Sequence, residues 1–389
     1  MIGRPAAESS AWRTAAALTI AAALLAMSCW TVVPGPTLVT LVLAIVVPEF
    51  APVSVAVGVL VTILVARLSR GRPRTVAIAL AVVADLCFAW PLAVFPFTQH
   101  AASVALDAAG FAEVRPQKTA AVDVMRDLPV PLRDGSALAL DIYRPRISGT
   151  LPLLVTIYGS AWTFGTRARE SGLAHRYAAQ GYAVAVIDYR HAPRYRFPTQ
   201  LDDVEDALRA IASHAADWHV DPHRVAILGR SSGAQLALLA AERPQPLRVF
   251  AVIALYAPVD LVGGWETLPR PDPLNVRSVL AAYLGGPPDA AHRGAYDAAA
   301  PASNVHAGMP PTLLIVGDRD EVVLPSFQRA FASRLRAAAV PVVTVELPWS
   351  NHAFDEVDGL GARIAHDAAA RFLAAELLAR PRRSGVVRP

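Results

Sequence analysis

Residues 229–233 read Gly-Arg-Ser-Ser-Gly and have the spacing G-x-S-x-G, with a serine at the centre and a glycine at each end. The run "VAIL" precedes them, and the helix-like "AQLALLAA" follows at once. At a tight turn from strand to helix this spacing pushes the central serine out above the sheet, and the flanking glycines let strand and helix approach. We therefore interpret Ser231 as an exposed nucleophile, the alternative being a phosphate-binding or merely tight turn.

A serine hydroxyl needs a base that takes its proton, and that base needs an acid that orients it. His352, in "PWSNHAF", follows the last predicted strand on a loop and is the predicted base among ten histidines. The preceding strand ends in "LLIVGDRDEVV", where Asp318, Asp320 and Glu321 are candidate acids, and we select Asp320. Asp260 is a competitor that could instead cap the segment after it.

Negative charge that develops on a carbonyl oxygen needs preorganised donors. We expect the backbone N–H of Ser232 to be one of them, because it directly follows the nucleophile. The loop after the first parallel strand reads Tyr158-Gly159-Ser160-Ala161-Trp162, and its small residues predict further donors from Ser160 and Ala161. The alternative is an ordinary turn.

The elements that must position these groups begin near residue 120. "AVDVMRDLPVPLRDGSALALDIYRP" predicts two antiparallel strands joined at Asp134-Gly135. Short apolar runs separated by helix-like segments follow, which predicts an α/β fold with a mostly parallel sheet covered by helices on both faces. The runs are 151–158, 182–189, 224–229, 248–256, 312–317 and 341–347, and the clearest helices are 199–217 and 325–339. The Pro- and Gly-rich residues 262–310 form a predicted lid-like insertion.

The first 100 residues have a different composition, rich in Ala, Val, Leu and Ile, and predict an all-α transmembrane anchor of about three helices. We expect spans at about 14–33, 37–66 and 75–97, the middle one interrupted by prolines. Arginines lie before the first span and at 67–74, whereas the connection at 34–36 has none, so the positive-inside tendency places the later domain outside the cytoplasm. Residues 101–120 are a predicted linker, 121–380 the catalytic domain and 381–389 a tail.

Two acids and two cysteines fall in the apolar region. A charge inside a membrane is costly, so Glu49 and Asp85 are candidates for a functional role. The alternatives are that they are protonated, paired between helices, or near the membrane interface. With Cys29 and Cys87 in predicted spans, the exported domain has no cysteine for a disulfide framework. The net charge of +4 comes from scattered arginines, so we expect no nucleic-acid partner.

Residues 121–375 resemble a serine carboxylesterase of the α/β-hydrolase fold, in the group of hormone-sensitive-lipase-like and feruloyl-esterase-like acetyl esterases. Besides the G-x-S-x-G motif and the order Ser231, Asp320, His352, the segment "DYRHAPRYRFPTQLDDVEDALRAI" resembles the one that these enzymes carry before the nucleophile strand. The resemblance implies a nucleophile, a base and an orienting acid at these positions. The sequence departs from the family where the usual His-Gly-Gly-Gly reads Tyr-Gly-Ser-Ala, because Ser160 and Ala161 lack glycine's freedom at positive φ.

The sequence thus predicts a membrane-anchored serine hydrolase that cleaves small carboxylic esters through an acyl-enzyme, with no metal or organic cofactor. Trp162, Phe164 and the 262–310 insertion are expected to border the acyl pocket, which weakly favours a short acyl chain. An acyltransferase or peptidase using the same triad is the alternative within enzymes. An idle binding or sensor module with this fold is the alternative outside them.

Overall fold

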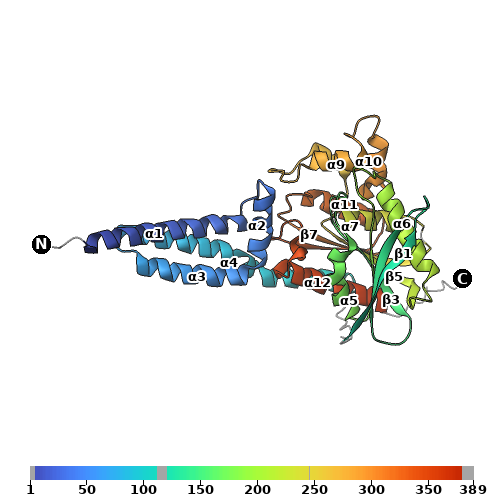
Figure 1. Ribbon diagram of the computed structural model, residues 1–389, viewed down its shortest axis with the longest axis horizontal. Coiled ribbons are helices and arrows are strands. Elements are labelled where there is room, and N and C mark those ends of the chain that lie inside the picture. Colours follow the sequence, from blue (N-terminus) through green and yellow to red (C-terminus); the bar gives the residue numbers. More distant parts are fainter. Residues whose placement is uncertain (1–4, 112–120, 245, 379–389) are drawn as a thin grey trace.

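The computed structural model describes residues 5–111, 121–244 and 246–378. A stalk of long helices lies at one end of the molecule and a sheet covered by helices at the other, with the N-terminus at the far end of the stalk (Figure 1). The predicted tail at 381–389 and residues 112–120 of the predicted linker lie outside the described residues. Residues 101–108 of that linker are helical and continue the last stalk helix.

One sheet of eight strands forms the centre of the domain, in the order β1-β2-β4-β3-β5-β6-β7-β8. β1 and β2 are antiparallel, and β3 to β8 run parallel to one another. This confirms the predicted α/β-hydrolase fold with a mostly parallel sheet. The strands are β1 Val122–Pro131, β2 Ala137–Pro145, β3 Leu151–Ile157, β4 Ala183–Ile187, β5 Val220–Arg230, β6 Val249–Leu255, β7 Thr312–Gly317 and β8 Val342–Leu347.

Helices cover both faces of this sheet, because successive side chains of a strand point to opposite sides. Leu153 of β3 belongs to one hydrophobic cluster, with α6, α7 and α11, and its neighbour Leu154 belongs to the other, with α5 and α12. The helices of the domain are α5 Ser171–Ala178, α6 Thr199–Ser213, α7 Ser232–Glu242, α8 Leu261–Glu266, α9 Val276–Leu284, α10 Arg293–Ala299, α11 Pro325–Ala337 and α12 Leu360–Leu373. Short 3-10 turns are η2 Arg167–Glu170, η3 Pro301–Ser303 and η4 Phe354–Glu356, and Ala374–Leu378 is a π-helical turn. The predicted insertion contains most of α8 together with α9, α10 and η3.

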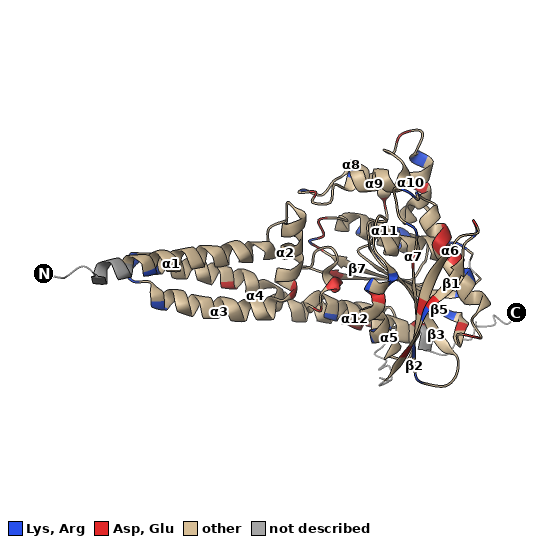
Figure 2. Ribbon diagram, in the orientation of Figure 1, with Lys and Arg blue, Asp and Glu red and all other residues tan. Residues whose placement is uncertain are grey.

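The stalk contains three helices that are long and apolar enough to cross a bilayer, over Ala11–Thr31, Ala51–Leu68 and Gly71–Ala108. They correspond to α1 Pro5–Ser28 with η1 Cys29–Thr31, α3 Ala51–Leu68 and α4 Gly71–Ala108. Figure 2 shows basic residues at the end of the stalk that is remote from the sheet, and little charge along its length.

The predicted span at 37–66 is divided in the structure. Its first part is the separate helix α2 Leu38–Glu49, which lies across the stalk at its junction with the domain (Figure 1), and α3 begins at Ala51. Pro52 stands in the first turn of α3, where its missing N–H is not needed, so the chain starts a new helix at this point. Glu49 therefore lies at the junction and outside the three candidate spans.

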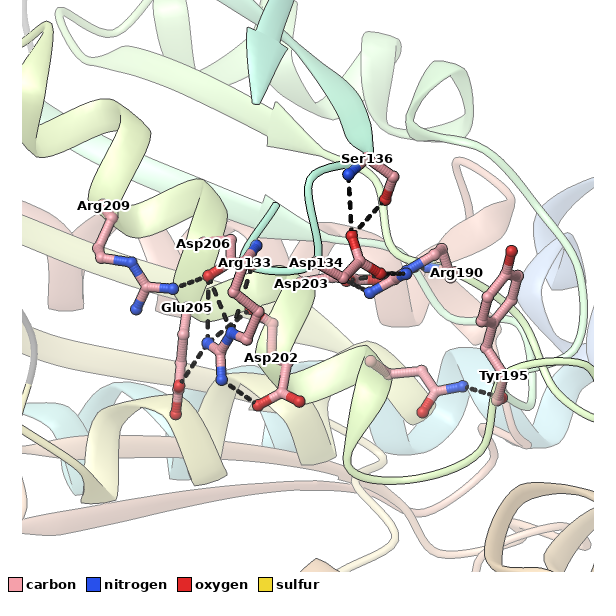
Figure 3. Close-up of polar contacts among 11 residues, drawn as sticks. Arg133, Asp134, Ser136, Arg190, Tyr195, Asp202, Asp203, Glu205, Asp206 and Arg209 are labelled. Carbon is pink, nitrogen blue, oxygen red and sulfur yellow. Dashed lines mark hydrogen bonds and ion pairs between the residues drawn. The ribbon is translucent and has the colours of Figure 1, made fainter. Parts of the chain in front are cut away.

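Arginine and carboxylate contacts fix the β1–β2 hairpin to α6, as Figure 3 shows. The hairpin turns at Asp134-Gly135 as predicted, with Gly135 at φ +84°. Arg133, beside this turn, pairs with Asp206 at 3.1 Å, and Arg190 pairs with Asp203 at 2.7 Å. The Arg190 contact holds the segment that follows β4 against α6, and this segment carries a tyrosine of the site described next.

Candidate active site

The turn from β5 to α7 holds Ser231 in a strained conformation, with φ +49° and ψ −120°. The two glycines around it are required by close backbone approach. A Cβ on Gly233 would lie 2.2 Å from the carbonyl oxygen of Ile157, and one on Gly229 would lie 2.3 Å from that of Gly233. The sharp turn therefore depends on both glycines, and the strain it stores is typical of functional positions.

The structure brings Ser231, His352 and Asp320 together from three separate loops. The Nε2 atom of His352 lies 2.9 Å from Ser231 Oγ, and its Nδ1 atom lies 2.8 Å from Asp320 Oδ2. Asp320 Oδ1 also accepts the backbone N–H groups of Val322 and Val323 at 2.8 and 2.7 Å, which fixes the carboxylate. With a proton on Nδ1 donated to Asp320, Nε2 is free to accept the proton of the serine hydroxyl.

The competing acid is placed elsewhere. Asp260 accepts the backbone N–H of Gly263 at 2.8 Å and is the N-cap of α8, as the sequence allowed. Asp318 pairs with Arg329 on an exposed part of the surface. Of these aspartates, Asp320 is the one whose carboxylate contacts His352.

Two of the three predicted oxyanion donors are open. Within the described part of the chain, the backbone N–H groups of Ala161 and Ser232 donate no hydrogen bond. The N–H of Ser160 donates to Ser232 Oγ at 2.8 Å and is therefore engaged. Ala161 and Trp162 both have positive φ, at +49° and +58°, so the loop adopts the backbone that glycine would favour despite its side chains.

Tyr189 was not among the predicted site residues, and it holds this loop in place. Its hydroxyl lies 2.6 Å from Ser160 Oγ and 3.3 Å from Ser232 Oγ, and donates to the Tyr158 carbonyl at 3.2 Å. Its ring stacks on that of Tyr158 with centroids 4.6 Å apart. Burial raises the pKa of Tyr189 to about 12, so the hydroxyl keeps its proton. The signal for it was present, because Tyr189 belongs to the quoted segment that begins at Asp188.

A buried ionic cluster lies behind the histidine. The Nε atom of Arg230 lies 2.8 Å from Asp355 Oδ2, its Nη1 atom lies 3.3 Å from Glu170 Oε1, and the Tyr256 hydroxyl donates to Asp355 Oδ1 at 2.5 Å. The Tyr256 ring packs against His352 with centroids 4.6 Å apart. Burial alone would lower the pKa of Arg230, but the charges of Asp355 and Glu170 outweigh it and hold that pKa well above its usual value. No sequence spacing links these residues, so the cluster could not be predicted.

The connection between α1 and α2 contacts the acid loop. Glu321, next to Asp320, accepts the backbone N–H of Gly35 at 2.7 Å through Oε2 and the Asn351 side-chain amide at 2.7 Å through Oε1. Asn351 directly precedes His352. One carboxylate therefore ties the stalk to both the acid loop and the histidine loop.

A second carboxylate, that of Glu49 at the end of α2, reaches the histidine loop. Ser350 Oγ donates to Glu49 Oε1 at 2.5 Å, and the backbone N–H of Gly361 donates to Oε2 at 2.5 Å. Burial raises the pKa of Glu49 to about 7 even though both hydrogen bonds oppose this change. The partners of Glu49 in the structure are thus a hydroxyl and a backbone N–H of the sheet domain.

An apolar pocket opens beside Ser231. Trp162 and Phe164 line it as expected, and the predicted insertion contributes a wall. The Trp162 ring stacks on that of Tyr283 in α9, with centroids 4.1 Å apart, and Gln235 of α7 accepts the Trp162 Nε1–H at 3.0 Å. The insertion residues that line the pocket are Gly264, Thr267, Pro269, Leu274, Val276, Val279 and Leu280.

The chain is similar in sequence to several known proteins. A family model described as BD-FAE matches residues 140–335. The probable carboxylic ester hydrolase LipM of Mycobacterium tuberculosis is 35% identical over 259 residues, which are 62% of this chain and 58% of that protein. Esterase LipC of the same organism is 32% identical over 256 residues, or 62% of each chain. The alignments thus span less than two thirds of the length of these relatives.

Solved structures agree on the fold. The structure titled bacterial heroin esterase has a TM-score of 0.58 and 26% identity, with 70% of this chain and 90% of that chain covered. A hyperthermophilic esterase from the archaeon Pyrobaculum calidifontis has a TM-score of 0.57 and 21% identity, over 74% and 94% of the two chains. The family model covers just over half of the 389 residues, including Ser231 and Asp320. The chain belongs to the BD-FAE family, on the α/β-hydrolase fold.

Proposed function

We propose that the protein is a membrane-anchored serine hydrolase that cleaves carboxylic esters through an acyl-enzyme intermediate. The observation that carries the proposal is the continuous line of contacts from Ser231 Oγ through His352 to Asp320, at 2.9 and 2.8 Å, beside an apolar pocket. The names of the relatives, carboxylic ester hydrolase and esterase, support the same reaction class.

In the first half of the reaction His352 Nε2 takes the proton of Ser231 as Oγ attacks the ester carbonyl carbon. Asp320 holds the ring and stabilises the imidazolium that forms. The negative charge on the carbonyl oxygen is met by the open N–H groups of Ala161 and Ser232, each worth roughly a hundred- to a thousand-fold in rate. The imidazolium then gives its proton to the leaving alcohol, and the acyl group remains on Ser231.

In the second half water attacks the acyl-enzyme and His352 again acts as the base. The carbonyl charge develops at the same amide groups, and collapse of the intermediate returns the proton to Ser231. The acyl chain is expected to occupy the pocket between Trp162 and the insertion, where apolar walls bind it. We propose a short or medium chain for this pocket.

A fluorophosphonate probe tests the nucleophile, because it labels a serine only when that serine is activated. We expect the full-length protein to be labelled and Ser231→Ala to be silent. Ser333→Ala is the matched control, since Ser333 is an exposed serine of α11 whose hydroxyl donates to the Arg329 carbonyl, and its removal leaves Ser231 and its base in place. Labelling of folded Ser231→Ala, or none of the parent protein, would refute the assignment.

We further propose that the catalytic domain lies on the extracytoplasmic side. The support is the cluster of arginines at 67–74, which the positive-inside tendency assigns to the cytoplasm. A Thr150→Cys variant, with Cys29 and Cys87 replaced by serine, tests this, because Thr150 is exposed on the sheet domain. An impermeant maleimide should label it in intact cells, and labelling only after lysis would reverse the orientation.

A further inference from the structure

Helix α2 is apolar on all sides but is covered by protein on only one. Leu41, Ala44 and Val47 are buried against the rest of the molecule. On the other side Leu38, Val39 and Val42 are 56%, 73% and 54% exposed. A helix that is apolar all round is ordinarily buried, so the uncovered side needs an apolar cover.

The adjoining helices indicate that this cover is the bilayer. A span of about 20 residues crosses the hydrocarbon core, and counted from Arg74 in α4 such a span ends near Val94. The rest of α4, to Ala108, extends roughly 20 Å further at 1.5 Å per residue. The first span of the stalk ends at Thr31 and the next begins at Ala51. The connection and α2 lie between these ends, at the membrane surface.

The catalytic domain sits directly on this surface. The ring of Phe95, at the end of the α4 span, lies 6.1 Å from that of Trp349, three residues before His352. Further along α4, Ala102 and Leu106 are buried in the hydrophobic cluster that also contains α12. The anchor helix is thus one of the layers that cover the sheet, and the domain cannot move far from the bilayer.

The pocket wall faces the same junction. Glu321 holds Gly35 of the α1–α2 connection, and the next three residues, Val322, Val323 and Leu324, line the pocket. Ala353, from the histidine loop that Glu49 contacts, lines it too. In Figure 1 the chain between α8 and α9 extends from the insertion toward the stalk, and its residues Pro269 and Leu274 line the pocket as well.

We infer that the site takes its substrate from the bilayer: an amphiphilic carboxylic ester whose acyl chain passes from the lipid, along the exposed side of α2, into the apolar pocket beside Ser231. This inference rests on the proposed esterase function and adds the source and class of substrate. Phe164, which lines the pocket and is 56% exposed, offers an apolar surface for such a chain. A water-soluble ester would reach the same serine without any need for α2.

The test compares two esters with the full-length protein in phosphatidylcholine vesicles. One is didecanoylglycerol, a medium-chain ester carried in the vesicles and assayed by release of decanoic acid, and the other is p-nitrophenyl acetate in solution. We expect the parent protein to cleave both. Val39→Asp should lower the rate on didecanoylglycerol about tenfold, because it places a charge on the side of α2 that faces lipid. The rate on the soluble ester should stay within about twofold of the parent's.

Ile147→Asp is the matched control and should alter neither rate. Ile147 is 43% exposed and lies in the loop between β2 and β3, at the end of the sheet remote from Ser231. Fluorophosphonate labelling of Val39→Asp at the parent level shows that its site is intact. The inference is wrong if the parent protein cleaves the soluble ester but not the vesicle ester. It is also wrong if Val39→Asp leaves both rates unchanged or lowers both equally. In each of these cases the proposed function stands. If neither ester is cleaved, the proposed function fails as well.

Discussion

The two halves of the candidate site are supported in different ways. Ser231 and the oxyanion loop are held by the interior of the domain, through the glycine contacts of the β5–α7 turn and through Tyr189. The loops that carry Asp320 and His352 are held in part by the stalk, through Glu321 with Gly35 and through Glu49 with Ser350. The second pair of contacts joins residues 286 and 301 positions apart. The half that carries Ser231 is thus supported within the sheet domain, whereas the half that carries Asp320 and His352 uses the stalk as a structural support.

The nucleophile half gives the largest expected effect. Ser231→Ala should lower turnover on the order of a million-fold, because it removes the hydroxyl that lies 2.9 Å from His352 Nε2. Steady-state hydrolysis of p-nitrophenyl acetate measures it, with circular dichroism to show that the variant is folded. Comparable hydrolysis by the variant would remove Ser231 from the mechanism.

In the acid–base half, Asp320→Asn should lower kcat roughly a thousand- to ten-thousand-fold, because the amide no longer stabilises the histidine tautomer that accepts a proton at Nε2. Asp260→Asn is the matched control. Its side chain caps α8, and asparagine caps a helix as well as aspartate does, so kcat should stay within about twofold. An equal loss in the two variants would mean that the choice of acid is wrong.

Tyr189→Phe should have a smaller effect on kcat, because it changes only the support of the oxyanion loop. The change removes the hydroxyl that joins Ser160, Ser232 and the Tyr158 carbonyl and leaves the stacked ring. We expect kcat to fall about tenfold with little change in KM, because the loop supports donors that act mainly in the transition state. A change in KM alone would assign Tyr189 to substrate binding instead.

Much of the first half could be predicted, because its signals are local in the sequence. The G-x-S-x-G spacing predicted the turn, apolar runs predicted the buried strands to within a few residues at most ends, and the loop after β3 was found as a source of amides. The engagement of the Ser160 N–H could not be predicted, since it depends on the rotamer of Ser232 across two loops. The middle span was also less regular than its hydropathy implied, because α2 is as apolar as a span but only 12 residues long.

The supports of the second half could not be predicted, for a physical reason. Glu49 lies in an apolar run, and its only visible feature is the cost of a charge there. Its partners, the Ser350 hydroxyl and the Gly361 N–H, follow no spacing that relates them to residue 49. Such contacts become visible only when the packing of α2 against the domain is known.

The smallest expected effect is a pH dependence of stability at this contact. Burial places the pKa of Glu49 near 7 in the folded protein, above its ordinary value of 4.5. The folded state therefore favours the protonated carboxyl. The stabilisation is complete below about pH 4.5 and is lost as the pH rises through 7, with an upper bound of about 3 kcal/mol. We expect the thermal midpoint of the full chain in nanodiscs to fall by several degrees between pH 5.5 and 8.

Glu49→Gln should remove most of that fall, because glutamine does not titrate and its carbonyl can still accept a hydrogen bond from Ser350 or Gly361. Glu346→Gln is the matched control, since Glu346 pairs with Arg329 on an accessible part of the surface, and it should keep the parent's pH dependence. If Glu49→Gln kept it as well, another group would be responsible. The stalk would then support the acid–base half through packing and the Gly35 contact, without a titrating group at α2.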